Sequence, residues 1–165
     1  ARPLGLQPKR RTVILFAPPE GVDLRRCPLV IDCEELFYFK PEAGIVLGSP
    51  ADETDSPPCD AQPEEFDIAR VVERIEAATT LRIRRLAHKW AGLRSFVTDR
   101  TPVVGHDPEI KGFVWLAGQG GYGIMTSPAM SRAAATLATG NAWPQDIAAH
   151  GIHAEDLSPG RPSLA

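Results

Sequence analysis

Short apolar runs with β-branched and aromatic residues recur through the first fifty residues of the chain. Residues 11–17 (RTVILFA) are rich in β-branched and aromatic side chains, and Pro18 and Pro19 follow them without a backbone N–H for a sheet ladder. The same pattern recurs in three further runs, at residues 28–31, 36–39 and 44–47. Because these runs are too close together for helices between them, the sequence predicts an antiparallel meander, with residues 40–44 as its last turn.

An amphipathic helix is predicted after this meander. Residues 49–62 are polar, acidic and proline-containing, which predicts a surface excursion. Pro63 and Glu64 then suit a helix start, since proline is tolerated early and carboxylates favour the helix N-terminus. Apolar residues follow at three- and four-residue spacing, at Ile68, Val71, Val72 and Ile75. This stripe predicts a helix that packs on the sheet and ends near Thr80.

The second half of the chain predicts further strands and one more helix. Residues 87–96 and 102–105 are expected to be extended, and residues 113–117 (FVWLA) to form a buried strand. A cap followed by proline at Ser127 and Pro128 predicts a helix that ends at Gly140. The tail from residue 141 is too rich in Pro, Gly and His to assign. The fold class is therefore α+β, an antiparallel or mixed sheet with packed helices.

A glycine-rich stretch precedes the second helix and satisfies the pattern GxGxxG. It runs Gly118, Gln119, Gly120, Gly121, Tyr122, Gly123. The dinucleotide-binding fingerprint also needs a following strand with an acidic residue about 20 residues on, and none is predicted here. Two readings stay open: a turn whose amides approach an anionic or carbonyl-rich group, or glycines that only permit tight strand-to-helix packing.

Two arginines and a tyrosine are candidates for ligand contacts. Arg94 lies in an extended, mostly apolar segment, and Arg11 begins the first strand. A guanidinium cannot be neutralised there and matches a carboxylate in shape, so each arginine serves either a structural salt bridge or a bound carboxylate. Tyr38 places a hydroxyl in a bulky strand and is either a core-edge aromatic or a ligand contact.

Composition excludes several other classes of function. The 165 residues carry a net charge of -3 with interspersed signs, which argues against nucleic acid or an anionic membrane as partner. There is no apolar run long enough for a transmembrane helix and no signal-like start, so we expect a cytoplasmic protein. The three cysteines and four histidines lack metal-ligand spacing, and no metal is expected.

Residues 90–124 (WAGLRSFVTDRTPVVGHDPEIKGFVWLAGQGGYGI) resemble the C-terminal signature of the D-amino acid oxidase-like flavoproteins. Residues 8–16 (PKRRTVILF) and 37–50 (FYFKPEAGIVLGSP) are similar to strands of the D-arginine dehydrogenase and glycine oxidase group. The resemblance implies the C-terminal portion of a two-domain flavoprotein that binds FAD. It implies a substrate-binding sheet and crossover helix over residues 1–88, a return to the flavin over 89–140, and a tail over 141–165.

The resemblance also implies roles for individual residues. Arg11 and Arg94 look like the pair that holds a substrate carboxylate, and Tyr38 like a phenol that hydrogen-bonds it. Gly121 matches the position whose carbonyl receives the substrate amine. The cofactor-binding segment that it implies comprises Gly118, Gln119, Gly120, Gly121, Tyr122, Gly123 and Ile124.

The expected activity is oxidative deamination of a D-amino acid, with hydride transfer from Cα to FAD. Alternatives are a glycine or sarcosine type of amine oxidase and a non-catalytic carboxylate-binding fragment. Nothing before Arg11 resembles the βαβ unit that binds the adenosine diphosphate of FAD, so we expect an N-terminal FAD-binding portion as partner. The substrate side chain and the electron acceptor stay open.

Overall fold

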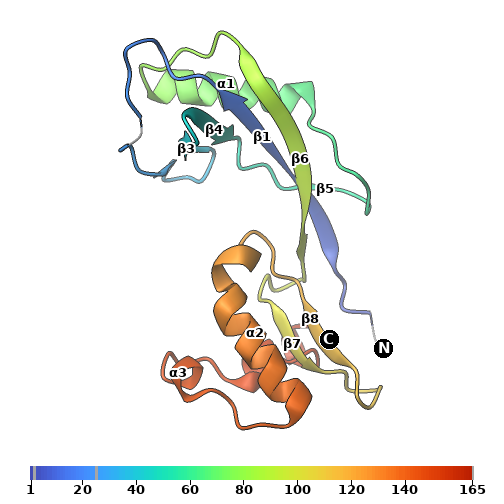
Figure 1. The fold of residues 1–165 in the computed structure, drawn as a ribbon. Helices are drawn as coiled ribbons and strands as arrows, with labels where there is room; N and C mark the ends of the chain where they lie inside the picture. Colours follow the sequence, from blue (N-terminus) through green and yellow to red (C-terminus); the bar gives the residue numbers. More distant parts are fainter. Residues whose placement is uncertain (2, 25, 165) are drawn as a thin grey trace. The chain divides into compact units, whose positions relative to one another are not determined.

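The computed structural model describes residues 1, 3–24 and 26–164 and divides the chain into two units (Figure 1). One unit is Lys9–Leu93, and the other combines Ala1–Pro8 with Arg94–Ala165. The boundaries fall within two long strands, β1 (Gln7–Phe16) and β6 (Leu86–Phe96). These two units are defined by contacts within the structure. The division by function that is expected at residues 88 and 140 stays a prediction.

In the unit Lys9–Leu93 the predicted meander is confirmed only in part, because β1 pairs with residues 45–49 and not with residues 30–31. Its strands are β2 (Val30–Ile31), β3 (Tyr38–Glu42), β4 (Ile45–Ser49) and β5 (Thr54–Asp55). They form a sheet in the order β2-β3-β4-β1-β5, with β6 also pairing β1. The turn between β3 and β4 is shorter than expected, only Ala43 and Gly44. Their φ angles are 47° and 89°, a conformation typical of two-residue hairpin turns that match the twist of the strands.

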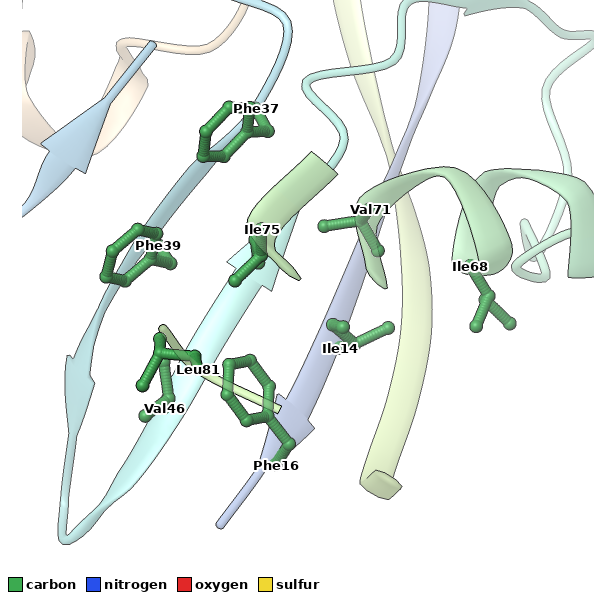
Figure 2. Close-up of a cluster of buried hydrophobic side chains, with 9 residues drawn as sticks. All are labelled: Ile14, Phe16, Phe37, Phe39, Val46, Ile68, Val71, Ile75 and Leu81. Atoms are coloured by element: carbon green, nitrogen blue, oxygen red, sulfur yellow. The ribbon is translucent and has the colours of Figure 1, made fainter. Parts of the chain in front are cut away.

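Helix α1 (Glu65–Ala78) covers one face of this sheet, as its apolar stripe predicted (Figure 2). Ile68, Val71 and Ile75 are buried against Ile14 and Phe16 of β1. Gly48 of β4 lies under the helix, and a Cβ there would come within 2.8 Å of Ile75 Cδ1. A larger residue at this position would have to displace the Ile75 side chain.

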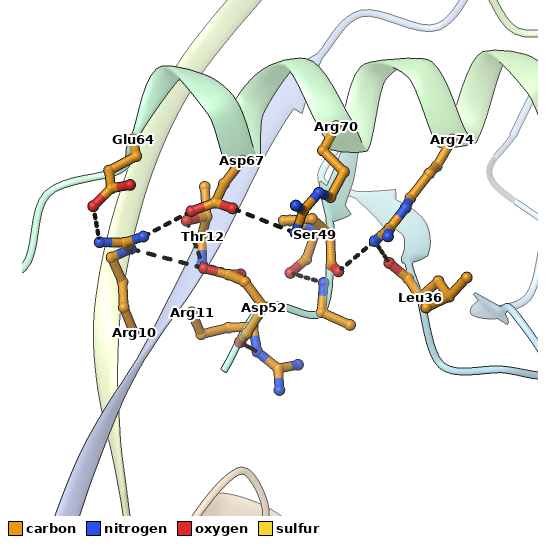
Figure 3. A network of polar contacts seen from close by, with 12 residues as sticks. Arg10, Arg11, Thr12, Leu36, Ser49, Asp52, Glu64, Asp67, Arg70 and Arg74 are labelled. Atoms are coloured by element: carbon orange, nitrogen blue, oxygen red, sulfur yellow. Dashed lines mark hydrogen bonds and ion pairs between the residues drawn. The ribbon is translucent and has the colours of Figure 1, made fainter. Parts of the chain in front are cut away.

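Side chains of β1 alternate between the two faces of the sheet, which fixes where its polar residues point. On the α1 side, Arg10 donates to Asp67 in the first turn of the helix, with Nη2 and Oδ2 2.8 Å apart (Figure 3). Thr12 gives both its N–H and its hydroxyl to the carboxylate of Asp52 (2.7 and 2.9 Å). Asp52 is buried, as are Ser49 and Ala61, so the prediction of a surface excursion over residues 49–62 is wrong at these residues. The Asp52 carboxylate can be buried because Thr12 supplies the hydrogen-bond donors that it needs.

The second unit contains the hairpin of β7 (Val103–His106) and β8 (Val114–Ala117), with α2 (Gly123–Thr139) packed against it (Figure 1). The predicted start of α2 near Ser127 and Pro128 is wrong, because the helix begins at Gly123. Pro128 cannot donate to the carbonyl of Ile124 four residues earlier. The Ser127 hydroxyl donates to that carbonyl instead (2.8 Å), which helps the helix to continue through the proline.

The tail that the sequence left unassigned completes the core of this unit. It forms three short helices, α3 (Gln145–Ala148), η1 (Ala154–Leu157) and η2 (Pro162–Leu164). Ile147 and Leu157 pack with Val104 of β7 and Met130 of α2. Among the helices that the structure describes, none is long and apolar enough to cross a membrane.

Arg161 of the tail clamps the turn that connects β6 to β7. Its Nε and Nη2 donate to the two carboxylate oxygens of Asp99 (2.7 and 2.8 Å), and the guanidinium also donates to the carbonyl oxygens of Thr101 and Pro102. The hydrogen bonds from Arg161 hold the pKa of Asp99 well below its usual range. The Asp99 carboxylate is therefore ionised throughout the ordinary pH range.

We expect the folded protein to lose stability as the pH falls below about 4, the pKa of an unfolded Asp. A carboxyl whose pKa is depressed by folding stabilises the native state above its unfolded pKa, and this contribution disappears as the pH falls toward the folded pKa. Thermal denaturation from pH 7 to pH 3 should show Asp99→Asn to be less stable than wild type at pH 7, with a smaller difference at pH 3. A difference that does not change with pH would contradict this assignment.

Candidate functional site

The glycine turn, residues 118–123, lies along the end of β6 in the same unit. The Gly120 N–H donates to the Ser95 carbonyl (3.0 Å). A Cβ at Gly121 would lie 3.4 Å from Arg94 Nε and 3.5 Å from Arg94 Cδ. The structure thus brings together Arg94 and Gly121, two of the residues singled out in the sequence.

Phe96 accounts for the glycine at position 120, and it was not among the residues expected from the sequence to form the site. A Cβ at Gly120 would come within 2.3 Å of Phe96 Cε1, and the Phe96 side chain is buried. Gly120 also has φ 53°, in the left-handed region that favours glycine. Arg94 and Phe96 are two residues apart in a strand, so both point to the same side and each lies against one glycine. This i, i+2 spacing is the sequence signal that could have found Phe96.

Arg94 is buried in part, and the residues that the structure describes give it no counter-charge. Its Nη1 is buried and has no hydrogen-bond partner among the residues that the structure describes. No carboxylate within the described ranges forms an ion pair with this guanidinium. The salt-bridge alternative for Arg94 therefore finds no support, and a buried donor remains available to a ligand.

Arg11, in contrast, already has protein partners. Its Nη2 lies 3.0 Å from Glu53 Oε1 and its Nε donates to the Asp52 carbonyl (2.7 Å). Because Arg10 and Thr12 point toward α1, Arg11 points to the opposite face of the sheet. The structural salt bridge left open for Arg11 is thus present, and a role in substrate binding stays a prediction.

Tyr38 lies on the same face of the sheet as Arg11. Its neighbours Phe37 and Phe39 belong to the core under α1, so the half-buried Tyr38 side chain points away from the helix. Strand β4 separates β3 from β1, and Tyr38 pairs with Ser49 in the register of that sheet. Its proposed hydrogen bond to a substrate remains a prediction.

The N-terminus of α2 is open to a ligand. Tyr122 occupies the cap position without a side-chain cap, and the first turn contains no acidic residue. The first amides of a helix have no partner within the helix and carry a partial positive charge. Tyr122, Ile124 and Met125 around them are largely exposed apolar side chains. Within the described residues, no cluster of three or more His, Cys, Asp or Glu side chains could hold a metal.

Residues 1–137 match the sequence pattern of the family described as DAO, FAD dependent oxidoreductase. The chain belongs to this family. FAD is the cofactor on which the family depends.

Similarity to individual proteins agrees with the family. The chain is 30% identical over 144 residues to FAD-dependent oxidoreductase domain-containing protein 1 of Xenopus laevis, covering 81% of this chain and 28% of that protein. Its structure is similar to glycine oxidase from Geobacillus kaustophilus, with a TM-score of 0.67, 20% identity, and coverage of 85% of this chain and 37% of the oxidase. Fructosamine oxidase from Aspergillus fumigatus gives a TM-score of 0.72 at 16% identity, covering 98% and 41%. The chain thus spans well under half of each of these relatives, and the two structures support the fold.

The open end of α2 fits the requirements of a bound flavin. Uncapped amides at Gly123 and Ile124 suit the carbonyl-rich pyrimidine end of the isoalloxazine ring, which gains negative charge on reduction. The exposed apolar side chains of Tyr122 and Ile124 suit a flat aromatic group. We therefore expect residues 118–124 to hold FAD mainly through their backbone.

Two alanine substitutions in the glycine turn should have different effects. Gly120→Ala places a methyl group against the buried Phe96 ring in a left-handed conformation, so we expect a loss of several degrees in Tm. Gly121→Ala meets only the Arg94 side chain at ordinary contact distance and lies outside the left-handed region, so the fold should be retained. Comparing the thermal midpoints of the two variants tests this, and equal losses of stability would contradict it.

Proposed function

We propose that this chain supplies the carboxylate-binding part of a flavoprotein that oxidises the bond between Cα and the amine nitrogen of an amino acid. The observation that carries the proposal is the buried, unpartnered Nη1 of Arg94 beside the glycine turn. A guanidinium in this condition gains most from a carboxylate, because the ligand supplies both the missing acceptor and the counter-charge. A cytoplasmic location is part of the same proposal.

The relatives support an amine next to the carboxylate. Glycine oxidase, iminodiacetate oxidase and L-proline dehydrogenase are each named for a substrate that carries an amine one carbon away from a carboxylate. The specific reaction that we propose is oxidative deamination of a D-amino acid. Oxidation of glycine or sarcosine is the second candidate, which the similarity to two glycine oxidases favours.

In the proposed reaction Arg94 binds and orients the substrate. Its guanidinium holds the carboxylate, while the Gly121 carbonyl accepts a hydrogen bond from the amine, so that two contacts fix the direction of the Cα–H bond. FAD, when bound, supplies the acceptor for the hydride. The substrate loses a hydride from Cα and a proton from nitrogen to form an imine, and water converts the imine to a 2-oxo acid and ammonia.

Arg94→Ala should lower kcat/KM of the FAD-loaded protein by about 10², because a charge-assisted contact that also sets orientation is lost. Arg94→Lys should recover only part, since an ammonium cannot reproduce the planar fork. Steady-state kinetics with D-amino acids, glycine and sarcosine would measure the effect and separate the two candidate substrates. Values near wild type for Arg94→Ala would assign this arginine to the structure alone.

Arg11 and Tyr38 provide the comparison within the other unit. Because Arg11 is already bound to Glu53 and the Asp52 carbonyl, we expect Arg11→Ala to lower Tm and to change kcat/KM less than Arg94→Ala does. Tyr38→Phe removes only the hydroxyl and should raise KM if that group contacts the substrate. A rise in KM for Arg11→Ala equal to that for Arg94→Ala would make both arginines substrate ligands.

A further inference from the structure

The Phe96 ring is in contact with the glycine turn and with the side chain of Arg100. A Cβ at Gly120 would lie within 3.0 Å of three atoms of the ring, so the backbone of Gly120 is in close contact with it. The guanidinium carbon of Arg100 lies 4.3 Å from the centre of the same ring. Packing at this density leaves the ring little room to move.

Arg100 is itself fixed in place by the tail of the chain. It belongs to the turn between β6 and β7, where its N–H donates to the Val97 carbonyl (3.0 Å). The preceding residue, Asp99, is clamped by two hydrogen bonds from Arg161. Arg100, which contacts the Phe96 ring, thus belongs to a turn that is tied to Val97 and to Arg161 by hydrogen bonds.

The position of the turn determines what surrounds Arg94. Gly120 rests on Phe96, and the next residue, Gly121, lies against Nε and Cδ of Arg94. A change in the distance between the glycine turn and β6 would therefore change the space that is open to the Arg94 guanidinium. No polar partner among the described residues holds Nη1, so packing must hold this end of the side chain.

We propose that Phe96 is a positioning residue that orients Arg94 for the substrate carboxylate. The Phe96 ring fills the space under Gly120 and so fixes the distance between the glycine turn and strand β6. At this distance Gly121 is in contact with the Arg94 side chain and limits its movement. The proposal rests on the proposed function, because it gives Arg94 the task of binding a carboxylate. It assigns to Phe96 an effect on ligand affinity that acts through Arg94 and not through direct contact.

A double-mutant cycle tests this in the FAD-loaded protein. Acetate is the probe, acetamide is its uncharged control, and binding is followed by the change in flavin absorption. Phe96→Leu removes the flat ring, and we expect it to weaken acetate binding about tenfold. In an Arg94→Ala background the same substitution should have no further effect, because the group through which it acts is gone.

The controls separate positioning from a general loss of stability. Phe16→Leu makes the same change in the buried core under α1, far in sequence from the turn, and should lower Tm without altering acetate affinity. Phe96→Met keeps more side-chain volume and provides a second variant if Phe96→Leu does not fold. Tm and flavin content are measured for every variant.

The outcomes distinguish this inference from the proposed function. Unchanged acetate binding in Phe96→Leu and Phe96→Met, or an equal loss in the presence and absence of Arg94, would overturn the positioning role alone. If Arg94→Ala itself leaves acetate binding unchanged, the proposed carboxylate contact fails, and the role of Phe96 fails with it. A loss that disappears in the Arg94→Ala background supports both.

Discussion

Part of the Arg94 guanidinium is buried with no counter-charge among the residues that the structure describes, and burying a charged group without a partner costs free energy. Nη1 is the buried atom of this guanidinium that has no hydrogen-bond partner among the described residues. Proteins retain such groups where a ligand completes them or where the surrounding fold requires them. Gly121 favours the first explanation, because it lies against Arg94 and adds no side chain of its own there.

Several contacts far apart in the sequence support this arrangement. Arg161 near the end of the chain fixes Asp99, the turn at Asp99 presents Arg100, and Arg100 covers the Phe96 ring on which Gly120 rests. Each contact is modest in energy by itself. Together they remove alternative positions for the turn, which is how a fold orients a binding group before the ligand arrives.

The comparison of the two arginines shows how different the environments of similar residues can be. Both lie in strands and both were candidates for a salt bridge or a carboxylate ligand. Arg11 is satisfied by Glu53 and the Asp52 carbonyl, whereas Arg94 has an unsatisfied donor. The partners of Arg11 lie about 40 positions further along the chain. The sequence close to either arginine therefore does not predict which of the two has a protein partner.

Local patterns determined the strands of the first half, the apolar stripe of α1 and the glycine turn before a helix, because strand and helix periodicity are properties of neighbouring residues. The pairing of β1 with β4 was not among them. They also selected Arg94 and Gly121 as candidates. Three features required the tertiary structure: the burial of Asp52 on Thr12, the start of α2 ahead of Pro128, and the contact of Phe96 with Gly120. The first and the third depend on a partner from another segment, and the second is accompanied by the hydrogen bond from the Ser127 hydroxyl to the Ile124 carbonyl. Burial and hydrogen-bond satisfaction are decided by which segments meet in space, and a sequence read locally does not contain that information.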